Sequence, residues 1–447
     1  MDVNEFIKKL FERAGAAGFE ASEADYSASE DFSVEVKNGE IVDYSVSSGM
    51  GLGFRALVGG KMGYASTQVL DEDALELLID GAKENAALIE SADEEFIFAG
   101  SGSYPTLDVY NGEIDKITAA EKIDMAKRLE KACLAIDPRV TQCEGVEIMS
   151  GSAERRLVNS RGLDVSFREN YIGLYAAVLA QENGEVTSGM AIRLARNPGE
   201  LDIEKEAAKA VKEAVDGLNA DKAASGKYRV ILRNDVAGSI LRTFSSVFSA
   251  DAAQKGMSLL KGREGEVIGS PALTIVDDPL NPASPGATPF DGEGVAARRL
   301  AVVENGRLNT LMHNLKTAKK QGVESTGSAS KPSYASPVGV APHSLHIVPS
   351  DITPEALLGM AGDGVLITNV QGLHSGANQI SGDFSLGARG FLIEGGKVTR
   401  PVSQITVAGN FFELMKNVTA VADNLEFAFS SVASPNLLID GLSVAGK

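Results

Sequence analysis

The stretch "SVEVKNGEIVDYSV", residues 33–46, places Asn-Gly between two runs in which apolar and polar side chains alternate. Asparagine and glycine tolerate the positive φ angles of a type I′ turn, so the pattern predicts a β-hairpin that turns at Asn38-Gly39. The same device recurs at Gly59-Gly60, Asn183-Gly184, Asn305-Gly306 and Gly395-Gly396. Five hairpins indicate antiparallel meanders and argue against a doubly wound parallel sheet.

Four segments have the apolar spacing of helices that pack on a sheet. They are residues 1–18, 71–90, 118–136 and 203–218. The polar stretch "NADKAASGK" follows the last of them and offers the best domain boundary, near residue 225. We therefore predict an α+β protein. An N-terminal α+β domain, with an antiparallel sheet and flanking helices, covers 1–225, and a C-terminal β-rich domain of antiparallel strands covers 226–447.

The composition is that of an ordinary globular protein. Apolar residues make up 44% of the 447 residues and charged residues 23%, and the formal net charge is −19. A chain this acidic repels the phosphate backbone of nucleic acids, so we expect no direct nucleic-acid partner. No stretch reaches the roughly 20 apolar residues of a membrane span, and the first 18 residues lack the apolar core of a signal peptide. We expect a cytoplasmic protein with no membrane partner.

The histidines and cysteines form no familiar catalytic or metal motif. None of the four histidines lies in an HExxH sequence. His343 and His346 lie in an extended stretch and point to opposite faces, so we expect histidines at the surface or at strand edges. Cys133 and Cys143 have no CxxC spacing and are expected to be small buried residues. A GxSxG nucleophile elbow is absent from the sequence.

A long connection rich in proline and glycine, residues 276–299, carries an acidic set. Its members are Asp277, Asp278, Asp291 and Glu293. These carboxylates either bind a cation or act as acid and base, or they form turns and caps, which is the usual role of aspartate beside proline and glycine. Because loops this long are usually functional or disordered, we predict an ordered loop near a cleft or an interface.

The stretch "QGLHSGANQISGDFSLGARG", residues 371–390, concentrates polar side chains among glycines. They are His374, Ser375, Asn378, Ser381, Asp383 and Ser385. Such a loop either holds an extended peptide backbone through hydrogen bonds or is a connection between two strands built from Asx turns.

Beyond this point the sequence resembles the TldD/PmbA family, known as metallopeptidases and, by an older name, as modulators of DNA gyrase. The likeness rests on "GDFSLGARGFLIEGGKV", "VAGNFFELMKNVTAVADNLEF" and "SPNLLIDGLSVAG". It continues upstream through "FDGEGVAARRLAVVENGRL", "STGSA" and "VNSRGL" to "RALVGGKMGYAST", and so covers nearly the whole chain.

The resemblance implies the PmbA branch, also called TldE, which lacks the zinc site of TldD. TldD-type members carry HExxxH on a helix after a strand and a late cysteine. In this chain Arg242, Thr243 and Val247 occupy the HExxxH window, and no cysteine follows Cys143. A guanidinium and a valine offer no lone pair to zinc, and a threonine is no general base for metal-bound water. We therefore expect no metal ligand, catalytic residue or cofactor in this chain.

By the same resemblance, the chain is expected to be a non-catalytic PmbA/TldE-type subunit of a TldD/TldE zinc metallopeptidase complex. The TldD-type partner would supply zinc, and the complex would degrade or process unfolded peptides. In isolation the chain would be inactive, and a homodimer is the assembly considered for it there. Candidate peptide- or partner-binding residues are His374, Ser375, Asn378, Asp383, Ser385, Asp291 and Arg242. Two alternatives stay open: an independent hydrolase with a non-zinc site, or a protein-binding factor that modulates gyrase.

Overall fold

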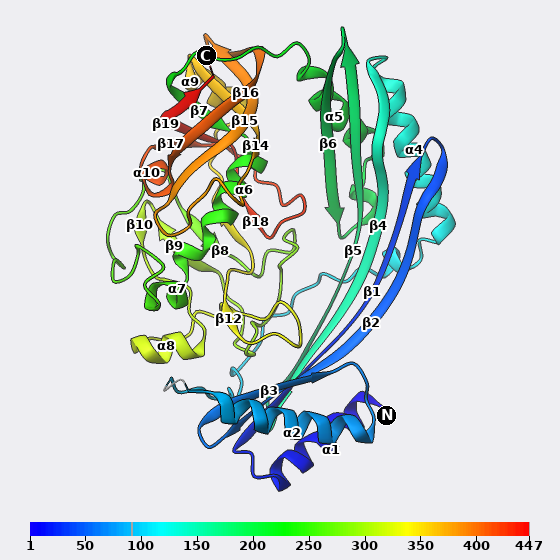
Figure 1. Ribbon diagram of the computed structural model, residues 1–447, viewed down its shortest axis with the longest axis vertical. Coiled ribbons are helices and arrows are strands. Elements are labelled where there is room, and N and C mark those ends of the chain that lie inside the picture. Colours follow the sequence, from blue (N-terminus) through cyan, green and yellow to red (C-terminus); the bar gives the residue numbers. More distant parts are fainter. Residues whose placement is uncertain (91–92, 447) are drawn as a thin grey trace.

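The computed structural model describes residues 1–90 and 93–446. It has two regions that lie side by side, a long curved sheet with four main helices and a compact β-rich unit (Figure 1). We call the residues up to the end of α5 the N-terminal region and those from β7 onward the C-terminal region. The predicted domain ranges include residues 91, 92 and 447, which lie outside the described part of the chain.

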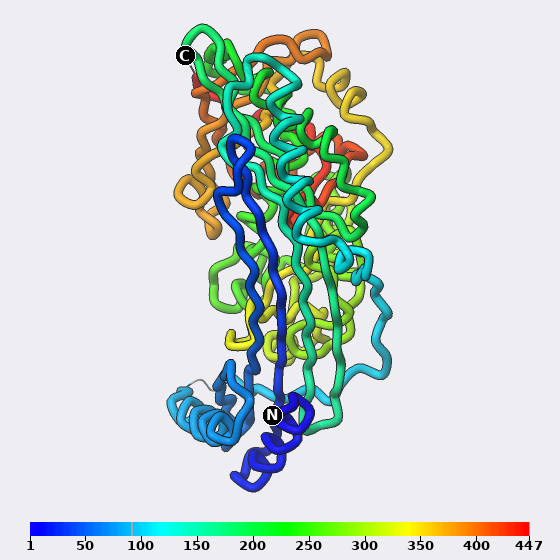
Figure 2. Tube along the Cα trace, turned by 90° about the vertical axis from the view of Figure 1, so that its right-hand side faces the viewer, coloured from blue at the N-terminus to red at the C-terminus, as the bar shows by residue number. Residues whose placement is uncertain are grey.

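The N-terminal region is built on one antiparallel sheet with the strand order β3-β2-β1-β4-β5-β6. Its strands are β1 Ala21–Lys37, β2 Glu40–Val58, β3 Lys61–Thr67, β4 Val140–Asn159, β5 Asp164–Glu182 and β6 Glu185–Ala195. The longest strands run most of the length of the molecule (Figure 2). All five predicted hairpin turns are confirmed, and both residues of each turn have positive φ angles.

Two pairs of helices cover the two ends of this sheet. They are α1 Val3–Ala16 and α2 Glu72–Leu88 at one end, and α4 Ala119–Ile136 and α5 Ile203–Asp216 at the other. These elements confirm the four helices predicted from apolar spacing. Each pair closes a separate core over the sheet, the first around Phe6 and Phe54 and the second around Leu129 and Ile148. A short helix, α3 Gly112–Asp115, lies between them in the chain.

The C-terminal region is a barrel with a second sheet beside it. Strands β16-β15-β14-β7-β19 pair in that order, and a pairing between β16 and β19 closes the ring. Its strands are β7 Gly226–Leu232, β14 Gly364–Gln371, β15 Asp383–Glu394, β16 Lys397–Asn410, β19 Leu437–Ala445 and, on the outside of β19, β17 Val418–Val421.

The second sheet has the order β10-β9-β8-β13-β18. Its strands are β8 Ile275–Asp277, β9 Leu300–Glu304, β10 Arg307–Leu308, β13 Leu345–Ile347 and β18 Val432–Ala433. A separate ladder joins β11 Ala329–Ser330 to β12 Gly339–Val340. The helices of this region are α6 Asn234–Phe244, α7 Ala250–Gln254, α8 Leu315–Gln321, α9 Pro354–Ala361 and α10 Phe411–Lys416. Phe244, Phe248 and Phe411 pack together in the main core.

Two strand pairings depart from the prediction of antiparallel strands. β7 and β14 run parallel, and so do β13 and β18. Strands joined by a tight hairpin must be antiparallel, but these partners are separated by long connections that carry the chain back to the same end. Hairpin signals in the sequence therefore could not reveal them. Within the described residues, no helix combines the length and apolar character needed to cross a membrane.

Candidate functional site

The HExxxH window falls at the end of α6, and its three positions do not share a face. Arg242 is exposed and Thr243 half-buried in the last turn of the helix, whereas Val247 lies in the 3-10 turn that follows and is fully buried in the core. The Thr243 hydroxyl donates to the carbonyl oxygen of Ser239 at 2.9 Å. These residues do not fit zinc, because no imidazole, thiolate or carboxylate stands at any of the three positions.

No alternative metal site compensates for this window in the part of the chain that the structure describes, where no three His, Cys, Asp or Glu side chains group as ligands. His346 is 6% exposed, so its expected place at the surface or at a strand edge is wrong, whereas His343 is half-buried. His346 lies on β13, an inner strand of its sheet, and its ring packs edge-on against Phe427. Three residues of strand are too few for an alternation that would reveal the burial.

The acidic set of the loop 276–299 mainly holds backbone amides. Asp291 is completely buried, and its carboxylate accepts hydrogen bonds from the amides of Glu293, Val295 and Ala329 at 2.9 to 3.0 Å. Asp277 is buried and accepts from the amides of His343 and Ser344. These bonds match the turn-forming alternative rather than a cation site. Burial raises the pKa of Asp291 to about 7, because removal from water disfavours the charged carboxylate.

Glu293 has a different role, because it joins a buried ion network between the two regions. Arg55 of β2 donates to Glu23 at 2.6 Å and to Glu293 at 3.4 Å, and all three side chains are at most 5% exposed. Beside them, Asp25 of β1 bonds Arg155 at 2.8 Å and the ammonium of Lys331 at 2.6 Å. We call these six residues the inter-region ion network. Three acids and three bases balance, as a buried cluster of charges requires.

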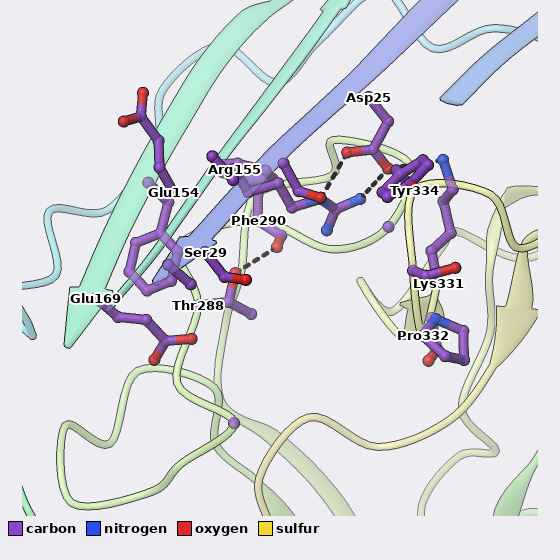
Figure 3. A pocket seen from close by; sticks show the side chains of 18 of the residues that line it. Asp25, Ser29, Glu154, Arg155, Glu169, Thr288, Phe290, Lys331, Pro332 and Tyr334 are labelled. Atoms are coloured by element: carbon purple, nitrogen blue, oxygen red, sulfur yellow. Dashed lines mark hydrogen bonds and ion pairs between the residues drawn. The ribbon is translucent and has the colours of Figure 1, made fainter. Parts of the chain in front are cut away.

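A cavity of about 460 Å³ opens beside the network. Figure 3 shows Ser29, Glu154 and Glu169 of the sheet on one side and Lys331, Pro332 and Tyr334 on the other. Tyr334 lies directly on β2, where a Cβ atom at Gly51 would collide with its ring and one at Gly53 with its carbonyl oxygen. Glycine at these positions therefore lets the loop of the C-terminal region touch the sheet.

Two more cavities adjoin the sheet, one on each of its faces. One, of about 650 Å³, lies among β1, β2, β4 and α3, and the other, of about 840 Å³, lies between the sheet and two loops of the C-terminal region. Ser29 and Ala153 line all three. The cavity of about 650 Å³ lies on the face that α4 covers, where the Lys122 ammonium donates to Ser150, and its lining residues all belong to the N-terminal region. We call the other two cavities together the inter-region groove. The loop 276–299 contributes Pro285 to both of them, which confirms the prediction of an ordered loop at a cleft.

The floor of the groove is flat because its side chains are small. Ser29 of β1 pairs with Gly49 of β2 on one side and with Ala153 of β4 on the other, and all three line the groove. Gly151 lies one pleat further along β4. A sheet face of serine, glycine and alanine leaves room for a second chain above it. Sequence analysis missed this floor, although the alternate small residues Ser27 and Ser29 of β1 and Gly151 and Ala153 of β4 are a signal for it.

The predicted binding loop 371–390 lies elsewhere. β14 ends at Gln371 and β15 begins at Asp383, so only residues 372–382 form a loop, and the last eight residues of the stretch are strand. The Asn378 side chain accepts from the amides of Ile380 and Ser381, and Asp383 accepts from Ser381 and Asn410. The loop thus contains the Asx turn of the second alternative.

Most of the candidate binding residues therefore gather away from the groove. His374, Ser375, Asn378, Asp383 and Ser385 belong to this loop or to the start of β15, and none of them lines the three cavities. The loop reaches the segment that follows α6, where the Ser246 hydroxyl donates to the side-chain oxygen of Gln379. Ser246 is close to Arg242 in the sequence. Asp291 alone adjoins the groove, since its neighbours Phe290 and Gly292 line the first cavity. The role of these residues in binding stays a prediction.

Three family models match successive parts of the chain. They describe the PmbA/TldA metallopeptidase domain 1 at residues 22–86, the central domain at 112–218 and the C-terminal domain at 225–446. The chain is also similar to the metalloprotease PmbA homolog of Haemophilus influenzae. The two are 28% identical over 455 residues, which span 99% of this chain and 95% of that protein.

Solved structures share the fold over the full length. A crystal structure from Thermotoga maritima, described as a candidate modulator of a DNA gyrase, matches with a TM-score of 0.92 and 34% identity, over 99% of this chain and 100% of that one. TldE from Thermococcus kodakarensis matches with a TM-score of 0.90 over 99% and 100% of the two chains. Its 23% identity makes this a likeness of fold. The predicted α+β fold is confirmed.

Proposed function

Because the chain belongs to the TldD/PmbA metallopeptidase family, we propose that it is the non-catalytic, PmbA/TldE-type subunit of a zinc peptidase complex. The HExxxH window carries this proposal. Arg242, Thr243 and Val247 lack zinc-binding atoms, and the end of α6 at Phe244 separates the first two positions from the third. In this proposal a TldD-type partner supplies the zinc and the hydrolysis, and an unfolded peptide is the substrate.

The contribution of this chain would be to hold the peptide in an extended form. The inter-region groove supports that role, since its floor of Ser29, Gly49 and Ala153 is flat and its opposite wall consists of ordered loops. An extended chain presents its backbone groups at regular intervals, so a flat polar floor accepts many sequences. The loop 372–382 satisfies much of its own hydrogen bonding, which makes the groove the better candidate of the two.

Co-expression with the TldD-type protein of the same organism tests the subunit role. Size-exclusion chromatography should show both chains in one peak, and an unfolded peptide should be cleaved only by the mixture. A chelator should abolish this cleavage by removing the partner's zinc. Separate elution, or chelator-insensitive cleavage by the isolated chain, would overturn the proposal. The second outcome would favour an independent hydrolase, with Asp277, Asp291 and Asp383 as the first residues to replace.

A substitution at the centre of the groove tests the substrate-guiding role. Ser29→Tyr places a large side chain where the two cavities of the groove meet. Cleavage of an unfolded peptide by the complex should fall, with KM rising more than kcat changes. Ser45→Tyr, on an exposed part of β2 outside the groove lining, is the matched control. Equal cleavage by both variants would remove the groove from the proposal and return attention to the loop 372–382.

A further inference from the structure

The largest cavity of the groove combines large apolar and aromatic side chains with charged ones. Its volume is about 840 Å³, within the range of sites that enclose a bound organic group. Tyr171 and Leu194 line it from the sheet, and Phe427 and Phe429 line it from the connection between β17 and β18. We call this cavity the aromatic pocket. Phe429 is 57% exposed, so much of its ring is open to a ligand.

The wall that carries the two phenylalanines is fixed against the sheet. The amide of Leu194 on β6 donates to the carbonyl oxygen of Ala428 at 3.2 Å. Next to it, the guanidinium of Arg193 donates to Glu426 at 2.9 Å. Figure 1 shows the connection between β17 and β18 extending toward the long sheet. The pocket therefore exists before any ligand arrives, and binding requires little ordering of the wall.

The rim of the pocket is acidic, and its positive charges are already paired. Arg193 pairs with Glu426, and Arg196 pairs with Glu169 at 3.0 Å. Among the described residues, the other three carboxylates of the lining have no ion pair. They are Asp31, Asp108 and Glu200, and all three are exposed. Five carboxylates against two guanidiniums give the lining a formal net charge of −3. An acidic ligand is repelled here, and a basic one is attracted.

We infer that the aromatic pocket binds a large apolar side chain of an extended peptide whose neighbouring residues are basic. The inference rests on the proposed function, because it treats the groove as the peptide site and adds the class of peptide preferred. The pocket interior removes the apolar side chain from water. Lysine or arginine on either side of it reaches Asp31, Asp108 or Glu200. Because these carboxylates are exposed, salt screens the electrostatic part of the preference.

Fluorescence anisotropy on the isolated chain, without any partner subunit, tests the preference. Three unfolded, labelled peptides of equal length serve as probes: one with phenylalanine between lysines, one with phenylalanine between glutamates, and one with serine between lysines. We expect the first to bind about tenfold more tightly than either of the others. Raising the salt concentration should weaken the binding of the first peptide. The ratio of affinities between the phenylalanine peptide and the serine peptide, both with lysines, should stay largely unchanged.

Substitutions in the chain locate the effect. Phe429→Ser should reduce the preference for phenylalanine over serine, and Asp31→Asn combined with Asp108→Asn should reduce the preference for lysine over glutamate. Matched controls lie on α2: Leu77→Ser replaces an apolar side chain of similar exposure, 59%, and Asp80→Asn removes one exposed charge. All these side chains are exposed, so the variants should fold, which circular dichroism checks.

The outcomes separate this inference from the proposed function. Equal affinity for the three peptides overturns the inference and leaves an unselective groove. Unchanged binding by Phe429→Ser overturns the assignment to this pocket. The assignment is also overturned if the chain forms a dimer that Phe429→Ser dissociates, because the pocket is then an interface between two copies of the chain. Joint elution with a TldD-type partner is measured separately, so the subunit role can fail or hold whatever the peptides do.

Discussion

The N-terminal sheet meets the C-terminal region in two ways, and the two contacts are built oppositely. At one, the inter-region ion network and Tyr334 bring the two regions into direct contact, with Tyr334 packed on Gly51 and Gly53. At the other, the groove stays open over a floor of small residues. The direct contact holds the regions together, so the open one is free to take a ligand. Stability should depend on the first and binding on the second.

The largest effect on stability is expected at the centre of the ion network. Arg55→Ala leaves Glu23 and Glu293 buried without their cation, which should lower the free energy of unfolding by about 3–5 kcal/mol. Urea unfolding followed by circular dichroism measures the loss. Arg128→Ala is the control, because Arg128 pairs with Glu204 at the exposed surface and should matter by about 1 kcal/mol or less. Similar losses for both variants would mean that the network does not join the regions.

A smaller loss is expected where the backbone of Tyr334 touches β2. Gly53→Ala adds a Cβ atom that collides with the Tyr334 carbonyl oxygen, so the loop must shift and stability should fall by about 2–3 kcal/mol. Gly49→Ala adds the same atom four residues away on the same strand, where nothing lies within 4 Å. Urea unfolding should separate the two variants clearly. Equal stability would contradict the close contact between the loop and the sheet.

Next in size is a dependence on pH. The folded-state pKa of Asp291 is about 7, above its ordinary value of 3.8, so the folded chain holds a proton that the unfolded chain releases. Stability should therefore fall as pH rises from about 4 to 7, by roughly 2 kcal/mol between pH 5 and 7. Urea unfolding of Asp291→Asn and of the unchanged chain across this range measures the effect. The free energy of unfolding should fall less steeply with pH in Asp291→Asn. An identical slope would contradict the raised pKa.

The smallest effect on stability is expected in the groove. Ser29→Tyr fills empty space above a half-buried position, so the free energy of unfolding should change by about 0.5 kcal/mol or less. The same variant should bind an unfolded peptide poorly in the anisotropy measurement. A large loss of stability would show that the groove is a packed contact like the first one, and the comparison between the two contacts would fail.

Much of the fold could be predicted because its signals are local. Asn38-Gly39 and the four similar pairs adopt positive φ angles within two residues, whatever the rest of the chain does. The helices follow from spacing within one segment. The parallel pairing of β7 with β14 could not be predicted, since it joins segments more than 130 residues apart, such as Val230 and Val365, and leaves no local pattern.

The candidate site also has some features that the sequence predicts and others that only the structure reveals. Residue type at Arg242, Thr243 and Val247 is enough to exclude zinc ligation, because that exclusion depends only on which atoms a side chain carries. The ion network combines Asp25, Arg155 and Lys331 from three distant parts of the chain. Charges such as these look like ordinary surface residues in the sequence, and only the packed structure shows that they are buried.

The sequence alone determined the hairpins, the main helices and the loss of zinc-binding atoms, since each depends on neighbouring residues or on the chemistry of one side chain. The tertiary structure alone decided that the loop 276–299 meets the sheet and that the loop 372–382 lies away from the groove. It also decided that small residues on β1, β2 and β4 form one floor. These features depend on which distant surfaces come into contact, and that choice is made by burial of the whole chain.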